Sequence, residues 1–110
     1  MAGLAAEPAQ RAAGGGELIA LAAWAAQPDD PSTWRVIVIA VAEGHAHRGH
    51  GSEMKLAVIE RARQRGVRTI VSYVHVDNVA AQRMNDALGG RATLDPGDPL
   101  KNWLIYVLEI

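Results

Sequence analysis

The chain has 110 residues, enough for one domain with its own core but small for a complete α/β enzyme. Hydrophobic residues make up 49% of it and charged residues 21%, a globular balance, and the net charge of −1 argues against a nucleic-acid-binding module. The absence of cysteine excludes disulfides, thiolate metal ligands and cysteine nucleophiles, and no apolar stretch reaches the roughly 18–20 residues of a membrane span.

The first part of the chain is rich in alanine and carries few structural signals. Met1–Ala13 lacks a basic leader followed by an apolar block, so we do not interpret it as a signal peptide, and we expect a cytoplasmic protein. Pro8–Ala13 is long enough for one short strand, and Gly14–Gly16 predicts a turn or a flexible joint. Residues 1–16 are therefore expected to be flexible or a short edge strand, and residues 17–110 the core of a single domain.

Two apolar runs flank a turn-rich loop at the start of this core. Glu17–Ala26 is short, and periodicity alone leaves it open between a helix and a buried strand. Pro28–Ser32 interrupts the apolar pattern, and Trp34–Val41 is a β-branched run that predicts a strand covered on both faces. Because both runs flank one loop, a hairpin is favoured.

The rest of the sequence predicts a helix, a strand, a second helix, a turn and a last strand. In chain order these segments are Ser52–Arg65, Val67–Val76, Val79–Leu88, Asp95–Pro99 and Trp103–Ile110. The apolar stripe of the first helix is placed on Leu56, Val58, Ile59 and Ala62. The predicted order is β-β-α-β-α-β, an α/β fold whose central strand–helix–strand implies a parallel pair joined by a right-handed crossover.

The most informative segment is the glycine-rich turn before the first helix, Arg48-Gly49-His50-Gly51. A strand, such a turn and a helix N-terminus together form an anion site, because free backbone N–H groups and the helix dipole both face the turn. The segment is not a Walker loop, since no Gly-Lys-Ser/Thr follows, nor a dinucleotide fingerprint, since Met54 stands where glycine or alanine is required. A phosphate-bearing ligand is therefore favoured over a turn without function.

This turn resembles the acyl-CoA pyrophosphate loop of the GNAT acetyltransferases, Gln/Arg-x-x-Gly-x-Gly/Ala, of which Arg48 and Gly51 match the first two fixed positions. Asn78 follows the second parallel strand as in that family, and Met84–Gly89 is similar to its closing stretch, so the resemblance covers about residues 17–110. It implies a shortened GNAT-like mixed β-sheet with two helices. It also implies transfer of an acetyl group from acetyl-CoA to the amine of a small molecule or peptide, by direct attack of the amine on the thioester.

The resemblance also assigns roles to individual residues. In this family the strand before the loop is bulged and separates from the next parallel strand, and the pantetheine arm of the cosubstrate lies in the gap. The main chain of Val41, Ala42 and Glu43 would bind the arm, and Asn78 would contact it or orient the loop. The backbone amides that would hold the pyrophosphate are those of Arg48, Gly49, His50, Gly51, Ser52 and Glu53.

Several residues depart from the family pattern. Glu53 stands where glycine or alanine is usual, and its carboxylate either repels a diphosphate at about 6 Å by roughly 1–3 kcal/mol or points outward as an N-terminal cap. Asn85 occupies the position of a tyrosine that in many members protonates the leaving thiolate, and Gly90 replaces a phenylalanine. Glu53 and Asn85, together with the missing wall on the acceptor side, favour the alternative, a catalytically silent acyl-CoA-binding or dimerising remnant. Glu43 and His45 lie near the expected reaction centre and are candidates for a general base.

The remaining histidines and tryptophans have mostly structural interpretations. His45 and His47 would face one side of an extended segment, but the spacing supplies no third ligand, so no metal site is expected. Trp24, Trp34 and Trp103 are expected in the core or at an interface.

The resemblance also bears on the oligomeric state. Members of the family normally begin with a strand and two helices that wall the acceptor side of the cleft, and the residues before Glu17 are too few for a helix pair. An uncovered sheet face and a free parallel edge favour association. We therefore expect a homodimer.

Overall fold

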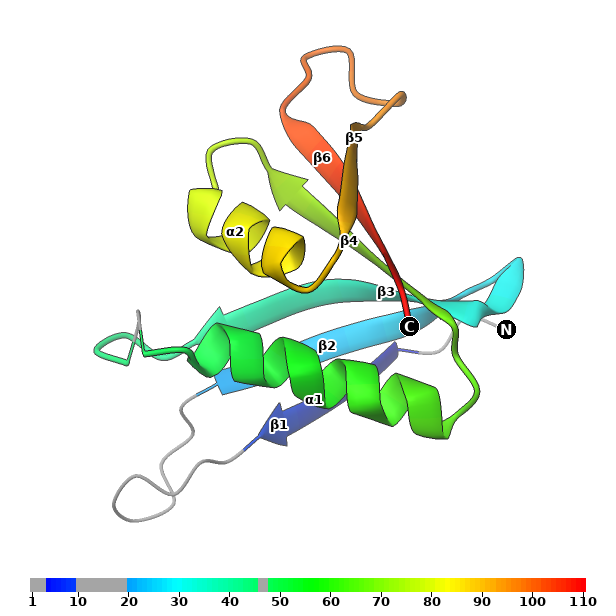
Figure 1. The fold of residues 1–110 in the computed structure, drawn as a ribbon, viewed down its shortest axis with the longest axis vertical. Coiled ribbons are helices and arrows are strands. Elements are labelled where there is room, and N and C mark those ends of the chain that lie inside the picture. The colour runs from blue at the N-terminus through cyan, green and yellow to red at the C-terminus, as the bar shows by residue number, and fades with distance from the viewer. Residues whose placement is uncertain (1–3, 10–19, 46–47) are drawn as a thin grey trace.

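The computed structural model describes residues 4–9, 20–45 and 48–110, and arranges them as one six-stranded sheet with two helices (Figure 1). In chain order the elements are β1 (Leu4–Ala9), β2 (Ala20–Gln27), β3 (Asp30–Val41), α1 (His50–Gln64), β4 (Thr69–His75), α2 (Val79–Ala87), β5 (Arg91–Leu94) and β6 (Trp103–Glu109). The strand order is β1-β2-β3-β4-β6-β5, in which β3 and β4 are parallel and all other neighbours antiparallel. The predicted α/β class, with a mixed sheet and two helices, is confirmed.

The hairpin expected in the first half is confirmed, because β2 pairs with β3 in antiparallel register. The first strand, however, is misplaced in the prediction: β1 covers Leu4–Ala9 rather than Pro8–Ala13. Residues 10–13 and the turn expected at Gly14–Gly16 lie outside the described residues. β5 escaped the sequence reasoning because it has only four residues, all of them exposed, so it carries no alternation of apolar and polar side chains.

Both helices pack against the same face of the sheet. Lys55 of α1 bonds to Ser72 of β4, and the Tyr106 hydroxyl of β6 donates to Asp86 of α2 at 3.0 Å. Ser72 and Tyr106 are register partners and therefore point to one side. The opposite face carries no helix from the described residues, and the exposed fraction of Ile37 in β3 reaches 49%. The prediction that this strand is covered on both faces is therefore wrong.

The core lies between α1 and the sheet. The rings of Trp24 and Trp34 stack there with centroids 5.4 Å apart, which confirms that these two tryptophans belong to the core. Trp103 does not, because 42% of it is exposed. In the apolar stripe of α1, Val58, Ile59 and Ala62 are buried as predicted. Leu56 is not, since it is 51% exposed, and the preceding residue, Lys55, is buried instead.

The C-terminal end of α2 is tightly packed, which accounts for Gly90. A Cβ atom at Gly90 would lie 2.9 Å from the backbone oxygen of Asn85 and 3.2 Å from Cδ1 of Tyr106. The N–H of Gly90 also donates to that same oxygen at 2.9 Å, so the backbone is held at this distance. A side chain at this position would force the neighbouring backbone to shift, so the phenylalanine usual in the family does not fit the arrangement seen here.

We expect Gly90→Ala to lower the free energy of unfolding by about 1–3 kcal/mol, because the added methyl group overpacks a contact made by backbone. Chemical denaturation followed by circular dichroism measures this difference. Gly51→Ala is the matched control, since its Cβ would meet only Cγ2 of Val41 at 4.0 Å. Equal stability of the Gly90→Ala variant and the native chain would contradict this account.

Candidate functional site

A gap in the sheet opens between the two parallel strands. β3 and β4 pair over only four residue pairs, from Thr33 with Thr69 to Val36 with Ser72. Directly after Val36, β3 has a bulge: Val36 faces Trp24 and Val38 faces the preceding residue of β2, so Ile37 is the extra residue. The bulge bends β3 away from β4. The separation of parallel strands expected from the family resemblance is therefore present.

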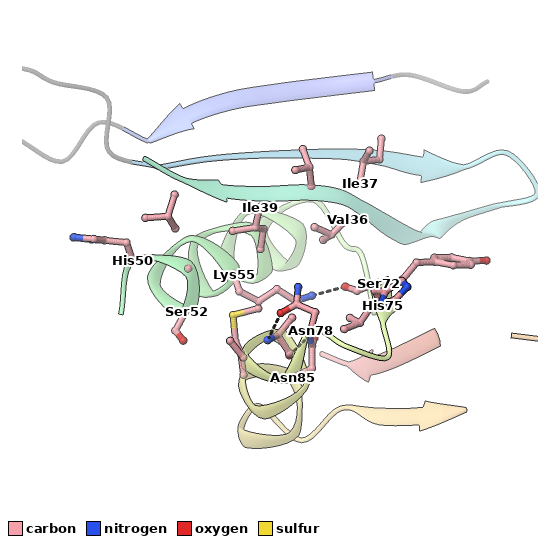
Figure 2. A pocket seen from close by; sticks show the side chains of 18 of the residues that line it. Val36, Ile37, Ile39, His50, Ser52, Lys55, Ser72, His75, Asn78 and Asn85 are labelled. Atoms are coloured by element: carbon pink, nitrogen blue, oxygen red, sulfur yellow. Dashed lines mark hydrogen bonds between the residues drawn. The ribbon is translucent and has the colours of Figure 1, made fainter. Parts of the chain in front are cut away.

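A cavity of about 530 Å³ lies in this gap (Figure 2). This volume is usual for small-ligand sites. Its walls come from β3, β4, the first turn of α1, α2 and the start of β6. Apolar side chains such as Val36, Ile39 and Val74 supply much of the lining.

The cavity is lined by side chains from both faces of the sheet. Ser72 and Val74 are buried on the helix-covered face, so the alternating Tyr73 and His75 point to the open face. All four residues line the cavity, together with Trp103, the register partner of His75. The cavity therefore connects the helix-covered face of the sheet with the open one.

The first turn of α1 presents backbone donors to this cavity. Gly49 precedes the helix with a φ of 83°, a left-handed conformation that glycine adopts at little cost. The first helical hydrogen bond runs from Glu53 N–H to Gly49 O at 3.0 Å, so the amides of His50, Gly51 and Ser52 have no helical partner. Gly49, His50, Gly51 and Ser52 all line the cavity. Free amides and the positive end of the helix dipole thus face the same space, as an anion site requires.

The structure brings most of the predicted site residues together, although their roles remain predictions. Those that line the cavity are Val41, His45, Gly49, His50, Gly51, Ser52, Asn78 and Asn85. Those outside its lining are Ala42, Glu43, Arg48 and Glu53. Glu43 is exposed, and Glu53, in the first turn of α1, is half-buried. The carboxylate that raised doubt about a diphosphate site therefore does not form part of the cavity wall.

The two asparagines of α2 are engaged by their own helix. Asn78 is the N-cap of α2, and its Oδ1 accepts from the N–H of Ala81 at 3.1 Å. Asn85 is buried, and its Nδ2 donates to the backbone oxygen of Ala81 at 2.8 Å. The Asn85 amide is therefore held against its own helix, and it offers no acidic proton to a ligand.

Lys55 is the cavity residue that sequence reasoning missed. It is 1% exposed, and its Nζ donates to Oγ of Ser72 at 2.5 Å (Figure 2). Ser72 is the one hydrogen-bond partner of Lys55 among the described residues. Burial lowers the pKa of Lys55 to about 8, since desolvation penalises the charged form. The signal was available: Lys55 lies three, four and seven residues before Val58, Ile59 and Ala62, on the buried face of α1.

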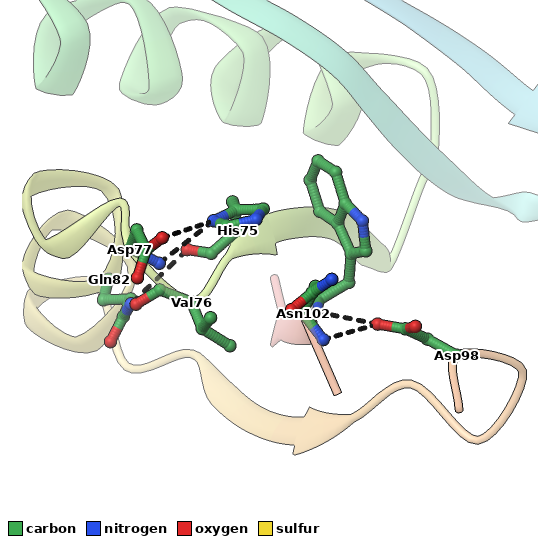
Figure 3. Close-up of polar contacts among 7 residues, drawn as sticks. His75, Val76, Asp77, Gln82, Asp98 and Asn102 are labelled. Atoms are coloured by element: carbon green, nitrogen blue, oxygen red, sulfur yellow. Dashed lines mark hydrogen bonds and ion pairs between the residues drawn. The ribbon is translucent and has the colours of Figure 1, made fainter. Parts of the chain in front are cut away.

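His75 is held in place at the carboxyl end of β4 (Figure 3). Its Nδ1 accepts from the backbone N–H of Asp77 at 3.1 Å, which assigns the proton of the neutral ring to Nε2. Its ring meets Trp103 edge to face, with centroids 5.1 Å apart. Gln82 of α2 donates to the backbone oxygen of Val76 at 2.7 Å and so ties the strand end to the helix. His75 and Trp103 form a fixed aromatic wall of the cavity.

Trp103 is held from the other side by the loop before β6. Oδ2 of Asp98 accepts from the backbone N–H groups of Asn102 at 2.6 Å and Trp103 at 3.0 Å (Figure 3). Its Oδ1 accepts from the backbone N–H of Leu100 at 3.1 Å. One carboxylate therefore satisfies three amides of this turn. The loop between β5 and β6 fixes where β6 starts and where the indole of Trp103 stands.

Comparison with known proteins decides the family. The model of the acetyltransferase (GNAT) family matches residues 5–89. The chain belongs to the GNAT family. No protein with a curated description matches the sequence.

Solved structures of GNAT acetyltransferases share this fold at low sequence identity. An IAA acetyltransferase from Bacillus cereus is 18% identical, with a TM-score of 0.73. The aligned region covers 88% of this chain and 73% of the Bacillus cereus chain. An acetyltransferase from Bacillus subtilis in complex with CoA is 20% identical with a TM-score of 0.74, covering 88% and 72%. The ribosomal-protein-S18-alanine N-acetyltransferase from Escherichia coli is 22% identical with a TM-score of 0.71, covering 86% and 63%. At these identities the likeness concerns the fold.

The described part of the chain contains no group of three or more His, Cys, Asp or Glu side chains placed to hold a metal ion. His47, one of the two histidines considered for such a site, lies outside it. Neither α1 nor α2, its two helices, has both the length and the apolar character needed to cross a membrane.

We expect the free energy of unfolding to rise between pH 8 and about 10, because native Lys55 loses its proton near pH 8 while the unfolded chain keeps it. Relative to the ordinary lysine pKa of 10.5, the lowered pKa of about 8 corresponds to a gain of up to about 3 kcal/mol. Above that window the pKa of Tyr106, raised by burial and by Asp86, acts in the opposite direction. Denaturation curves across this range measure the rise.

Lys55→Met should remove this dependence on pH, and Lys101→Met, at the other lysine of the chain, should retain it. A native protein whose stability stays flat between pH 8 and 10 would show that Lys55 titrates normally.

Proposed function

We propose that this protein is an acetyl-CoA-dependent N-acetyltransferase, in which acetyl-CoA and an acceptor amine meet inside the gap between β3 and β4. The observation that carries the proposal is the cavity through the sheet, with a helix N-terminus at one side and an open sheet face at the other. Such an arrangement lets two substrates approach one reaction centre from opposite faces. Family membership supports acyl transfer as the chemistry.

The pyrophosphate of the cosubstrate would bind at the first turn of α1. The amides of His50, Gly51 and Ser52 supply donors that need no rearrangement, and the helix dipole adds a favourable field. Because Gly51 has no side chain, an oxygen atom can approach the main chain closely there. From this turn the pantetheine arm would extend between the separated strands.

The main chain of the bulge would take over the contacts first assigned to Ala42 and Glu43. Beyond Val36, β3 pairs with β2 only, so the backbone edge of Ile37 and Val38 that would otherwise pair with β4 faces the cavity. An N–H group at this edge would hydrogen-bond the thioester carbonyl and stabilise the negative charge that develops on its oxygen. Orientation of the two reactants in the gap would supply most of the remaining rate enhancement.

The acceptor amine would enter from the open face, past Tyr73, His75 and Trp103. These aromatic rings and the exposed side chains of Ile37 and Val38 favour an acceptor with an apolar or aromatic group next to its amine. His45 also lines the cavity and stays the candidate general base, whereas Glu43 lies outside the lining.

A catalytically silent acyl-CoA-binding protein is the second candidate. The observation that favours it is Asn85, whose amide bonds to its own helix and provides no acid where many family members have a tyrosine. The two candidates share the cosubstrate site and differ in turnover. Only the enzyme would remove the acetyl group from acetyl-CoA, so release of the CoA thiol distinguishes the two candidates.

We expect Ser52→Asp to weaken CoA binding at least tenfold, because a carboxylate about 6 Å from the diphosphate is repelled even at an effective dielectric constant of 20–40. The fold should not suffer, since a negative charge suits the first turn of a helix. Isothermal titration calorimetry with CoA measures the change, and Ser52→Asn is the neutral control of similar size. Equal affinity of the two variants would place the pyrophosphate elsewhere.

Turnover is measured by thiol release from acetyl-CoA across a panel of alkyl and aryl amines. The chain contains no cysteine, so every thiol detected comes from CoA. We expect release that depends on the amine and saturates with acetyl-CoA. Binding without release would favour the silent candidate, and a native chain that binds no CoA at millimolar concentration would contradict both.

We also propose that the protein is a homodimer, because the open face of the sheet exposes apolar side chains such as Ile37, Val38 and Trp103 to solvent. A second copy over this face would cover them and wall the acceptor side of the cavity. Light scattering at micromolar concentration is expected to give twice the mass of 11.7 kDa. A monomeric mass would contradict the proposal.

A further inference from the structure

The buried ammonium group of Lys55 is an unusual feature of this cavity. It is fully buried at the wall of the cavity, next to Ser72, where the pairing of β3 and β4 ends. An ammonium group has three N–H donors, and Ser72 is the one acceptor that the described residues provide for it. A buried cation is costly unless it is paired, so this group lacks a partner that a ligand would supply.

The charges around Lys55 do not neutralise it. On the described residues, the titratable groups that line the cavity besides Lys55 are His45, His50, Tyr73 and His75, and no carboxylate is among them. Asp86 of α2 accepts from the hydroxyl of Tyr106 and is not part of the lining. The partner of the ammonium is therefore expected to be negative, and to belong to the molecule bound in the gap.

We propose that Lys55 is the proton donor to the thiolate that leaves during acyl transfer. The inference rests on the proposed function, which brings an acyl-CoA thioester into this gap. An arm that starts at the first turn of α1 and follows the separated strands ends where their pairing begins, beside Ser72 and Lys55. The place where many family members supply a tyrosine acid holds Asn85, which lines the same cavity.

The step balances without any other reactant. The lone pair of the acceptor nitrogen forms a bond to the carbonyl carbon, and the π electrons of the carbonyl move to its oxygen. When the carbonyl re-forms, the C–S bond breaks and its electron pair leaves with sulfur. The sulfur takes a proton from the Lys55 ammonium, and the proton lost by the acceptor nitrogen restores it. A lysine whose pKa is about 8 is well matched to this exchange with a thiol.

Ser72 acts as a positioning residue in this scheme. Its hydroxyl accepts one N–H of Lys55 and leaves two N–H groups of this cavity residue for a ligand. Removal of this hydroxyl should leave the charge in place but let the side chain move. Its effect should be smaller than that of replacing Lys55 itself.

The closing experiment compares the pKa of the CoA thiol bound to the native chain, to Lys55→Met and to Lys101→Met. CoA is incubated with excess protein, and its alkylation by iodoacetamide is followed between pH 6 and 10; the cysteine-free chain contributes no thiol. We expect a midpoint about one pH unit lower with the native chain and Lys101→Met than with Lys55→Met, because the ammonium stabilises the thiolate. Lys55→Gln provides a second neutral variant in case the methionine variant does not fold.

Turnover provides an independent measure. With an amine found active in the thiol-release panel, Lys55→Met should lower kcat about 100-fold and change the KM for acetyl-CoA less than threefold. The native kcat should fall as pH rises above about 8, where the ammonium is lost, and this decline should be absent in Lys55→Met.

The outcomes separate the two proposals. Equal thiol midpoints and equal kcat in the native and Lys55→Met proteins would overturn the role of Lys55 while leaving CoA binding and acyl transfer intact. Absence of CoA binding in calorimetry with the native chain would overturn the proposed function itself, and the role of Lys55 with it.

Discussion

The gap between β3 and β4 depends on one extra residue in β3. Ile37 has no partner in β2, and the bulge it creates follows directly on the last pair that joins β3 to β4. Four residue pairs hold the parallel strands together at one end, and the cavity occupies the space where further pairs would have formed. Backbone groups that a regular sheet would satisfy internally are thereby left for a ligand. Because of this gap, one cavity is lined by the helix N-terminus, the exposed aromatic wall and the buried lysine.

Lys55 lowers the stability of the fold, because it places a charged group in a buried position. An aliphatic side chain in the stripe of α1 would pack beside Val58 and Ile59 without the cost of desolvating a charge. Real proteins keep such inconsistencies mainly at functional sites. The neighbouring Ser72 shows the same departure, since it is a buried polar residue in a strand otherwise buried through Ile70 and Val74. These two polar residues on separate elements form one buried contact at the wall of the cavity.

Most of the architecture could be predicted from the sequence. Long periodic or β-branched segments predicted both helices and four of the strands, and the glycine-rich turn before α1 lies at the cavity, as the candidate anion site should. The rest depended on information that is not local. β5 is too short and too exposed to show a pattern, and the bulge at Ile37 lies within a uniform apolar run that looks like a regular strand. Lys55 was overlooked because a lysine in a helix is assumed to be solvated, although its spacing placed it on the buried face.

The three tryptophans divide the molecule in a way that is useful in the laboratory. Trp24 and Trp34 stack on each other inside the core, whereas Trp103 stands at the cavity with its indole partly in solvent and its edge against His75. Two of the intrinsic fluorophores therefore report on the integrity of the core, and the third on the occupancy of the cavity. Because its position is set by the Asp98 turn, the emission of Trp103 is a built-in optical reporter of ligands that enter from the open face.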